Sequence, residues 1–329
     1  MSNHNHLEKD QVVSQSDVSI YTYPATEKGI LLIEAKKSIN PIEWAKDNKN
    51  LIEQNLLEHG GLLLRGFNIN SLSEFNKFSQ IICPSLLEYT YRSTPRSSLG
   101  GKIYTTTEYP ADQSIPLHNE NAYSDSWPEK IMFFCAIPAK DGGETPIADS
   151  RKVLKRIDKE IVKKFEDKGV LYVRNYSPGV DLSWQEVFQT EDKQEVEKYC
   201  LNHSIKSFWN QTGPELTTKQ LCQVTLLHPI TKEKVWFNQA HLFHISSLNK
   251  ELIQALIAEV GEKNLPRNSF YGDETPIEEE VLNHIREAYE KEMITFRWQR
   301  GDIMILDNVL MAHGRKPYSG ERKIAVAMG

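Results

Sequence analysis

The stretch PLHNENAYSDSWPEKIMFFCAIPAKDGGETPIADS, residues 116–150, decides how the rest of the chain is interpreted. It begins with a proline, and the triplet His118-Asn119-Glu120 follows two residues later. In an extended segment, residues i and i+2 project to the same face, so His118 and Glu120 can both reach one ion while Asn119 points away. Alone, such a triplet is weak evidence, because a histidine close to a carboxylate is often only a hydrogen-bonded pair.

Two residues near the C-terminus complete a candidate metal site. His313 supplies a second imidazole, and the basic Arg322 follows it. Two neutral imidazoles and one carboxylate suit a ferrous ion that keeps its remaining positions open for chemistry on oxygen. We therefore predict a mononuclear iron site at His118, Glu120 and His313. The same ligand types also permit zinc, so a zinc hydrolase is the main alternative enzyme.

Composition and charge argue against several classes of protein. Of the 329 residues, 39% are hydrophobic and 26% are charged, which is ordinary for a globular protein. The net charge of −6, with no basic stripe, argues against a nucleic-acid partner. The first residues lack the features of a signal peptide, and apolar runs such as IMFFCAI are too short to span a bilayer. We expect a cytoplasmic protein without a membrane partner.

The chain is predicted to have a short tail and one domain. Residues 1–18 are polar, carry His4 and His6 and show no periodicity, which predicts a flexible N-terminal tail. No internal repeat or low-complexity linker divides the remainder, so residues 19–329 are predicted to form a single domain. Four widely spaced cysteines form no Cys-x-x-Cys pair and are expected to be buried free thiols: Cys83, Cys135, Cys200 and Cys222.

Hydrophobic spacing predicts helices around a β core. Residues 41–59 have helical spacing, as does a segment after Asp149 that Gly169 is expected to end, whereas GGLLLRG (60–66) and GVLYVRNY (169–176) are typical of strands. The short segments ITFRWQ, IMIL and RKIAVAMG near the C-terminus favour an antiparallel β core. We therefore predict a mainly β fold with flanking helices.

One helix start and two unusual stretches complete the survey. Thr275, Pro276 and Glu278 are expected to start a helix as its cap, first-turn proline and capping-box acid. Residues 234–248, KVWFNQAHLFHISSL, combine aromatic residues, amides and histidines, which is also typical of a buried core segment. Residues 89–109 either line a pocket or form a solvated connection, and they carry four charged residues: Arg92, Arg96, Lys102 and Glu108.

An ordered series of segments covers the chain from about residue 25 to its end: GGLLLRGF (60–67), TTTEYP (105–110), LHNENAYS (117–124), GGETPIADSR (142–151), VWFNQAHLF (235–243), FYGDETPI (270–277) and GDIMILDNVLMAHGRKPYSGERKIAVAMG (301–329). This series resembles the taurine dioxygenase family of iron(II)/2-oxoglutarate-dependent dioxygenases, in particular the branch that contains the syringomycin-pathway aspartyl hydroxylase. Such ordered matching is specific for family and fold and much less specific for substrate.

The resemblance implies a double-stranded β-helix (jelly roll) core and a set of site residues. Fe(II) would be held by His118, Glu120 and His313, with 2-oxoglutarate and O2 as cosubstrates. Arg322 would hold the distal carboxylate of 2-oxoglutarate, since a planar guanidinium can grip a carboxylate with two parallel hydrogen bonds, and Thr145 would be its hydroxyl partner. A hydrolase has no use for this clamp, so both residues count against the zinc alternative.

Glu120 is a departure from the many family members that carry aspartate at this position. Both side chains ligate iron. Halogenating relatives have a small residue there so that chloride can bind the metal, and Glu120 therefore favours hydroxylation or a related oxidation. Desaturation and epoxidation remain open, because they share their early steps with hydroxylation.

Candidate substrate contacts follow the triplet, lie in the stretch 234–248 or flank His313: Asn121, Tyr123, Asn238, Gln239, His241 and Arg315. Asp307 and Asn308 are predicted to brace the turn before His313 without touching the metal. His241 and His244 form a competing metal site at helical spacing, but no acidic third ligand follows nearby.

The resemblance favours a role in secondary metabolism, such as antibiotic biosynthesis. The substrate would be an amino acid, an amino acid derivative or an aminoacyl group tethered to a carrier protein. A homo-oligomer is common in the family. A non-catalytic jelly-roll binding protein is the alternative from another functional class, and the intact His-Glu-His set counts against it.

Overall fold

The computed structural model describes residues 17–25, 29–88, 91, 96–106, 109–177, 179, 181–211 and 213–329. Most of the predicted tail, residues 1–16 with His4 and His6, lies outside the described residues, as do Arg92 and Glu108. The first strand, β1 (Val18–Tyr23), begins at the fully buried Val18, which was expected to be the last residue of the tail. That residues 19–329 form a single domain stays a prediction.

The core contains two sheets. The larger one has eight strands in the order β1, β2 (Ile30–Ala35), β3 (Gly61–Arg65), β16 (Ile303–Asp307), β7 (Lys130–Ile137), β19 (Lys323–Met328), β5 (Ile103–Thr105) and β4 (Ser98–Gly100). Its pairings are antiparallel except that of β2 with β3. The smaller sheet has the order β6 (Ile115–His118), β17 (Met311–Arg315) and β9 (Ile147–Asp149).

Apolar side chains from both sheets share one hydrophobic cluster. Phe133 and Met304 come from the larger sheet, and Ile147 and Met311 come from the smaller one. Burial between facing sheets is the main favourable free energy available to a β fold of this kind. The two-sheet core confirms the predicted mainly β fold with a jelly-roll core and flanking helices.

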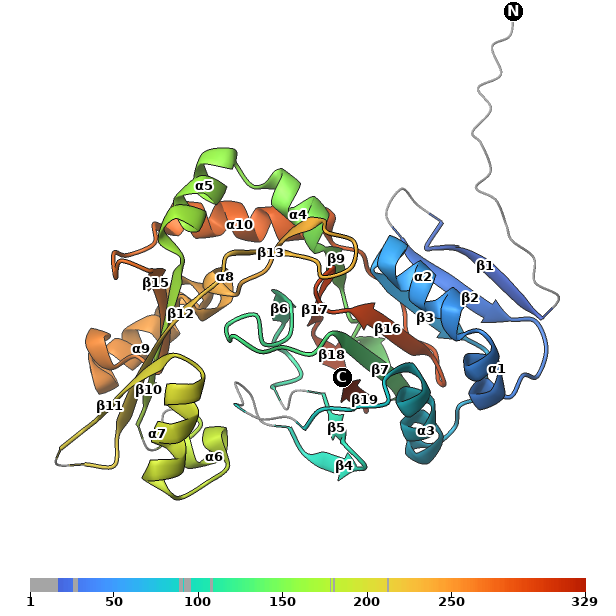
Figure 1. The fold of residues 1–329 in the computed structure, drawn as a ribbon, viewed down its shortest axis with the longest axis horizontal. Coiled ribbons are helices and arrows are strands. Elements are labelled where there is room, and N and C mark those ends of the chain that lie inside the picture. Colours follow the sequence, from blue (N-terminus) through green and yellow to red (C-terminus); the bar gives the residue numbers. More distant parts are fainter. Residues whose placement is uncertain are drawn as a thin grey trace, which may run out of the picture.

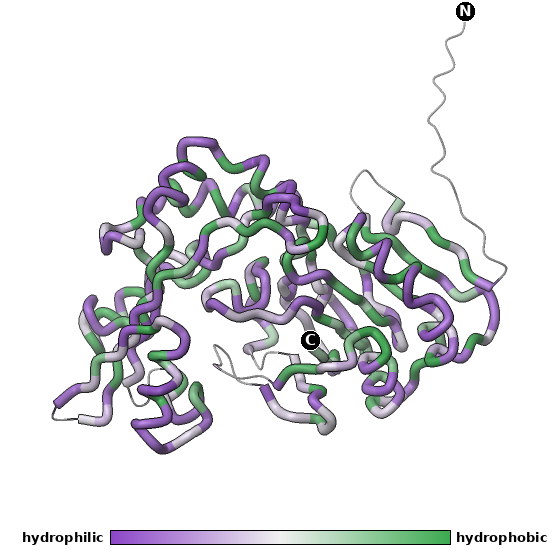
Figure 2. Tube along the Cα trace, viewed as in Figure 1, coloured by the Kyte–Doolittle hydropathy of each residue, from purple (hydrophilic) through white to green (hydrophobic). Residues whose placement is uncertain are grey.

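Three helices cover one side of the larger sheet (Figure 1): α1 (Pro41–Asp47), α2 (Lys49–His59), which packs on β3 and β16, and α3 (Leu72–Ile82), which packs on β7 and β19. Figure 2 shows hydrophobic residues along β2 and β3 and hydrophilic residues at many positions of α2. The predicted helix over residues 41–59 is interrupted at Asn48, whose backbone leaves the helical region and whose side chain donates a hydrogen bond to the carbonyl oxygen of Trp44. The predicted strand at 60–66 is confirmed as β3.

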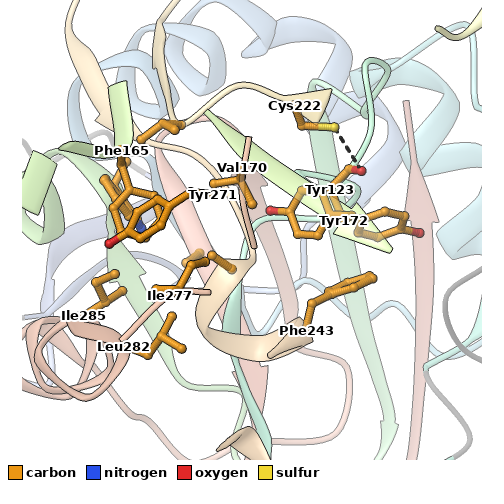
Figure 3. Packing of buried hydrophobic residues seen from close by; sticks show 14 of the residues in the cluster. Tyr123, Phe165, Val170, Tyr172, Cys222, Phe243, Tyr271, Ile277, Leu282 and Ile285 are labelled. Atoms are coloured by element: carbon orange, nitrogen blue, oxygen red, sulfur yellow. Dashed lines mark hydrogen bonds between the residues drawn. The ribbon is translucent and has the colours of Figure 1, made fainter. Parts of the chain in front are cut away.

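A second layered region packs beside the smaller sheet. Its four-stranded sheet has the order β11 (Ile205–Trp209), β12 (Leu216–Cys222), β10 (Val170–Tyr176) and β15 (Arg267–Tyr271). Around it are α4 (Ser150–Arg156), α5 (Lys159–Lys168), α6 (Trp184–Phe188), α7 (Lys193–Asn202), α8 (Ala240–Phe243), α9 (Lys250–Val260) and α10 (Glu279–Glu292). Figure 3 shows the aromatic core of this region, in which Phe165 packs against Tyr271, and Tyr123 against Phe243. Two short two-stranded sheets remain, β13 (Thr225–Leu227) with β14 (Lys234–Trp236), and β8 (Asp141–Gly142) with β18 (Tyr318–Ser319).

Two predicted helix boundaries are wrong. The segment after Asp149 forms two helices, because the carboxylate of Asp158 accepts a hydrogen bond from the backbone N–H of Glu160 and starts α5 afresh. The helix expected to start at Thr275 begins at Glu279 instead. The carbonyl oxygen of Thr275 accepts from the backbone N–H of Tyr271, so this segment is a turn after β15.

The predicted thiols are confirmed as free, and three of them are buried while Cys83 is partly exposed. Among the helices of the described ranges, none is long and apolar enough to cross a membrane.

Candidate active site

Strand pairing brings the predicted metal ligands together. His118, the last residue of β6, pairs directly with His313 in β17, and the two strands lie side by side in the centre of Figure 1. Oε2 of Glu120 lies 3.9 Å from Nε2 of His118 and 3.6 Å from Nε2 of His313. Ligand atoms of the three residues lie within 4.8 Å of one another, and within the described part of the chain this is the one group with such geometry.

The protonation states of these side chains suit a divalent metal. Burial and the neighbouring His313 lower the pKa of His118 to about 4, so its imidazole is neutral at neutral pH. Nδ1 of His118 lies 2.8 Å from the carbonyl oxygen of Pro116. Because a carbonyl only accepts, the proton sits on Nδ1 and the lone pair of Nε2 faces Glu120. Burial opposes ionisation of Glu120, but Arg96 and the two histidines lower the pKa of this carboxyl well below its usual range.

Arg96 is a site residue that the sequence did not single out. Its Nη2 donates to both carboxylate oxygens of Glu120, at 3.0 Å from Oε1 and 2.9 Å from Oε2. The Arg96 and Glu120 side chains are only 5% and 4% exposed. The one signal in the sequence was the position of Arg96 in the stretch 89–109, for which a pocket-lining role was one of two predictions.

Asn308 holds the turn that presents Glu120. Its Oδ1 accepts from the backbone N–H of Glu120 at 2.8 Å, and its Nδ2 donates to the Glu120 carbonyl at 3.0 Å and to that of Pro128 at 2.9 Å. Asp307 accepts from the N–H groups of Val309 and Leu310. These contacts are those expected of residues that brace the turn, a role that stays a prediction.

Arg322 and Thr145 lie together beside the histidines. Nη2 of Arg322 is 3.5 Å from Oγ1 of Thr145, and its Nε donates to the carbonyl oxygen of Gly143 at 2.9 Å. Trp298, another residue that the sequence did not single out, donates from Nε1 to the Thr145 hydroxyl at 3.1 Å. Burial and the nearby Arg315 lower the pKa of Arg322 to about 10, so it remains a cation at neutral pH.

Both groups of side chains open onto one pocket. Its lining combines histidines, arginines and apolar walls: Arg96, Thr106, Ile115, His118, Phe133, Thr145, His313, Gly314, Arg315, Arg322 and Val326. The geometry therefore places a candidate metal group on the same cavity as the Arg322 guanidinium, for which no carboxylate partner lies among the residues that the structure describes. A ligand that chelates the metal at one end and carries a carboxylate at the other matches this arrangement.

Of the six predicted substrate contacts, Arg315 is the one that lines this pocket. Its guanidinium also donates to the carbonyl oxygens of Tyr109 and Gln113. Asn121 has a left-handed φ of +56° and accepts a hydrogen bond from the Tyr123 hydroxyl. Tyr123 itself is buried in the aromatic cluster of Figure 3, where its carbonyl oxygen accepts from the thiol of Cys222.

The predicted contacts in the stretch 234–248 bind backbone groups instead of lining the pocket. Nδ2 of Asn238 donates to the carbonyl of Val224. Nε2 of Gln239 donates to the carbonyl oxygen of Asn119 at 2.7 Å. Nε2 of His241 lies 2.9 Å from the carbonyl oxygen of Leu117. The other proposed metal residue, His244, uses Nδ1 for the hydroxyl of Ser246. This stretch is the buried segment that its composition had also suggested.

Comparisons with known proteins agree with this geometry. The family model described as "Taurine catabolism dioxygenase TauD, TfdA family" matches residues 23–328. The dapdiamide synthesis protein DdaC of Enterobacter agglomerans is 47% identical over 277 residues, which are 84% of each chain. A clavaminate synthase-like protein of Arabidopsis thaliana is 31% identical over 293 residues, 86% of this chain and 85% of that one.

Among solved structures, PvcB from Pseudomonas aeruginosa has the same fold. Its TM-score is 0.55 at 15% sequence identity, and the match covers 99% of this chain and 94% of PvcB. PvcB, of which a second structure also matches, is described as an Fe, alpha-ketoglutarate dependent oxygenase from an isonitrile synthetic pathway. The family match over nearly the whole chain and the relative at 47% identity lead to one conclusion: the chain belongs to the TauD/TfdA family of dioxygenases.

Proposed function

We propose that this dioxygenase uses Fe(II), 2-oxoglutarate and O2 to hydroxylate an unactivated C–H bond of an amino acid, an amino acid derivative or a carrier-tethered aminoacyl group in secondary metabolism. One observation carries the proposal. His118 and His313, whose ring nitrogens lie close to the Glu120 carboxylate, line the same pocket as Arg322 and Thr145. A hydrolytic zinc site would need only the first of these two groups.

The residues present fit a ferrous ion. Two neutral imidazoles and one ionised carboxylate lie close enough together to hold one ion, and three protein ligands would leave further positions for the cosubstrates. Iron bound there supplies, with 2-oxoglutarate and O2, the oxidising power for attack on a C–H bond. The guanidinium of Arg322 and the hydroxyl of Thr145 are the partners for the distal carboxylate of 2-oxoglutarate.

The walls of the pocket have a separate task. Ile115, Phe133 and Val326 are apolar lining residues next to the histidines. Such apolar walls would limit the access of water to a bound metal, which favours reaction of the substrate over side reactions. The ring of Phe133 packs against that of His313, with ring centroids 5.2 Å apart.

The relatives support a role in secondary metabolism, since DdaC is named for dapdiamide synthesis and PvcB belongs to an isonitrile pathway. The tethering of the substrate to a carrier protein, a homo-oligomeric state and a location in the cytoplasm stay predictions.

The test is turnover by the purified protein with Fe(II), 2-oxoglutarate and a panel of amino acids and aminoacyl carrier proteins. We expect oxygen consumption, release of succinate and a product heavier by one oxygen atom, all of which require both Fe(II) and 2-oxoglutarate. A product lighter by two hydrogens would assign desaturation, and oxygen added to a C=C bond would assign epoxidation. Hydrolysis supported by zinc, with no oxygen consumption on any member of the panel, would contradict the proposal.

Substitutions at the metal group provide the second part of the test. His118→Ala and Glu120→Ala should abolish succinate release while circular dichroism shows the same secondary structure as in the wild type. Exposed His59→Ala is the matched control and should retain wild-type turnover. Unchanged turnover in a folded His118→Ala protein would refute the metal assignment.

A further inference from the structure

Arg96 and Glu120 form a buried ion pair at the edge of the candidate metal group. One nitrogen, Nη2 of Arg96, donates to both oxygens of the carboxylate. The two side chains are almost completely buried, so no bulk water competes for these hydrogen bonds. A charge-assisted contact in such surroundings fixes the orientation of a carboxylate strongly.

The two oxygens of Glu120 are not equivalent. Oε2 is the one that lies 3.9 Å and 3.6 Å from the ring nitrogens of His118 and His313. Oε2 is therefore placed to bind the same metal ion as the two imidazoles. Nη2 of Arg96 contacts both oxygens, at 3.0 Å from Oε1 and 2.9 Å from Oε2, but for Oε1 the arginine is the described partner whereas Oε2 also faces the two imidazoles.

We propose that Arg96 is a positioning residue that holds Glu120 as a ligand through one oxygen, Oε2, by retaining Oε1. The proposal rests on the metal site of the proposed function. An octahedral ion with two imidazoles and one carboxylate oxygen keeps three open positions, which are enough for a chelating 2-oxoglutarate and O2. A carboxylate that turned to bind through both oxygens would occupy one of these positions.

The length of the Glu120 side chain explains why such a residue is needed. Glutamate has one more rotatable bond than aspartate, so its carboxylate can reach the metal in more orientations. Asn308 fixes the backbone of Glu120 through its N–H and C=O groups, but it does not contact the carboxylate. Arg96 contacts the carboxylate itself and so restricts the orientation of the Glu120 side chain, which the backbone contacts of Asn308 do not.

Binding of Mn(II) to the metal-free protein, followed by isothermal titration calorimetry, tests the proposal without turnover. We expect Arg96→Gln to weaken Mn(II) binding by about 10- to 100-fold, as is typical when a residue behind a metal ligand is removed. Arg96→Lys keeps the charge and should fall between Arg96→Gln and the wild type. Equal Mn(II) affinity of the wild type and of whichever variant folds would overturn the proposal.

Arg65 offers a matched control. It forms a buried ion pair with Asp302, at 2.8 Å, with side chains 7% and 1% exposed, and it does not line the pocket. Arg65→Gln should lower the melting temperature and leave the Mn(II) affinity of the folded protein unchanged. An equal loss of Mn(II) affinity in Arg65→Gln would show a general effect of breaking a buried pair and would also overturn the assignment.

A measurement in a second background and the Mn(II) affinity of the wild type together separate this inference from the proposed function. In the Glu120→Asp background the shorter carboxylate cannot keep both contacts, so Arg96→Gln should cost less Mn(II) affinity there than in the wild type. An equal cost in both backgrounds would contradict a role through the glutamate. If the wild-type protein binds no Mn(II), the metal site itself and hence the proposed function fail; if only the variants are indistinguishable, the inference on Arg96 fails alone.

Discussion

Gly143 shows how a single residue without a side chain can shape an anion site. Its φ of +72° lies in the left-handed region, and its carbonyl accepts the hydrogen bond from Nε of Arg322. A β carbon at this position would lie 3.0 Å from Cδ and 3.1 Å from Nε of Arg322, and 2.9 Å from the β carbon of Ala139. A larger residue at position 143 would therefore strain the backbone and crowd the side chain of Arg322.

Gly143→Ala should displace the Arg322 side chain and weaken its contact with the carboxylate of 2-oxoglutarate. We expect the KM for 2-oxoglutarate to rise by about tenfold, which corresponds to a loss of about 1.4 kcal/mol of binding free energy. Mn(II) affinity should not change, since Gly143 does not contact the metal group. The matched control is Gly261→Ala, at which φ is +76° but no atom lies within 4 Å of the added carbon. Steady-state kinetics with varied 2-oxoglutarate provide the measurement, and an equal KM in Gly143→Ala and the wild type would refute this role.

At the scale of single residues, the sequence identified side chains that the structure brings together, and their role as metal ligands stays a prediction. His118 and Glu120 were singled out by their spacing in an expected extended segment, although β6 ends at His118 and Glu120 lies in the turn that follows. The distant His313 was singled out as the second imidazole of the set. The functions of Gln239 and His241 were not predictable, since an amide or an imidazole binds a substrate and a backbone carbonyl equally well. The choice depends on which carbonyl lies nearby, and that depends on the tertiary fold.

At the scale of elements, the segment that follows β6 is held by side chains from other parts of the chain. The carbonyl oxygens of Asn119 and Glu120 in this segment contact Gln239 and Asn308, and that of Leu117, within β6, contacts His241. Buried backbone groups outside a sheet need such partners. The turn that carries Glu120 is thus tied into the core although it is not a strand.

Asn308→Ala should destabilise the protein by about 3 kcal/mol, since it leaves buried N–H and C=O groups of the turn without a partner. Urea unfolding of the metal-free protein measures this loss. Asn55→Ala is the control, because the Asn55 side chain donates to a carbonyl of its own helix, and its effect should stay within about 0.5 kcal/mol. A loss below 1 kcal/mol in Asn308→Ala would mean that water or a backbone shift replaces these contacts.

Periodicity identified the inward faces of the helices but not all of their ends. Leu282, Ile285 and Tyr289, which recur at helical spacing, are buried in α10, and Val281 beside them is partly buried. The break before α5 was missed because the apolar spacing continues across it while the carboxylate of Asp158 caps a new helix. A capping residue such as Asp158 can start a new helix even where the apolar spacing continues, and here it sets the boundary between α4 and α5.

At the scale of the whole molecule, the candidate metal group joins parts of the chain that are far apart in sequence. His118 and Glu120 come from the region of β6, and His313 comes from β17 near the C-terminus. Binding one ion to all three therefore requires the sheet to be formed, and a ligand that binds only the folded state stabilises it.

We expect Mn(II) and 2-oxoglutarate together to raise the melting temperature of the wild type. At 100 times the dissociation constant, the linked stabilisation is about 2.7 kcal/mol, which corresponds to a shift of about 5 °C for a protein of this size. A chelator should reverse the shift, His313→Ala should show none, and the exposed-site control His59→Ala should keep it in full. Differential scanning calorimetry without O2 measures the effect apart from catalysis. A full shift in His313→Ala would place the bound metal elsewhere, because an ion that stabilises the fold without His313 cannot be the one that joins β6 to β17.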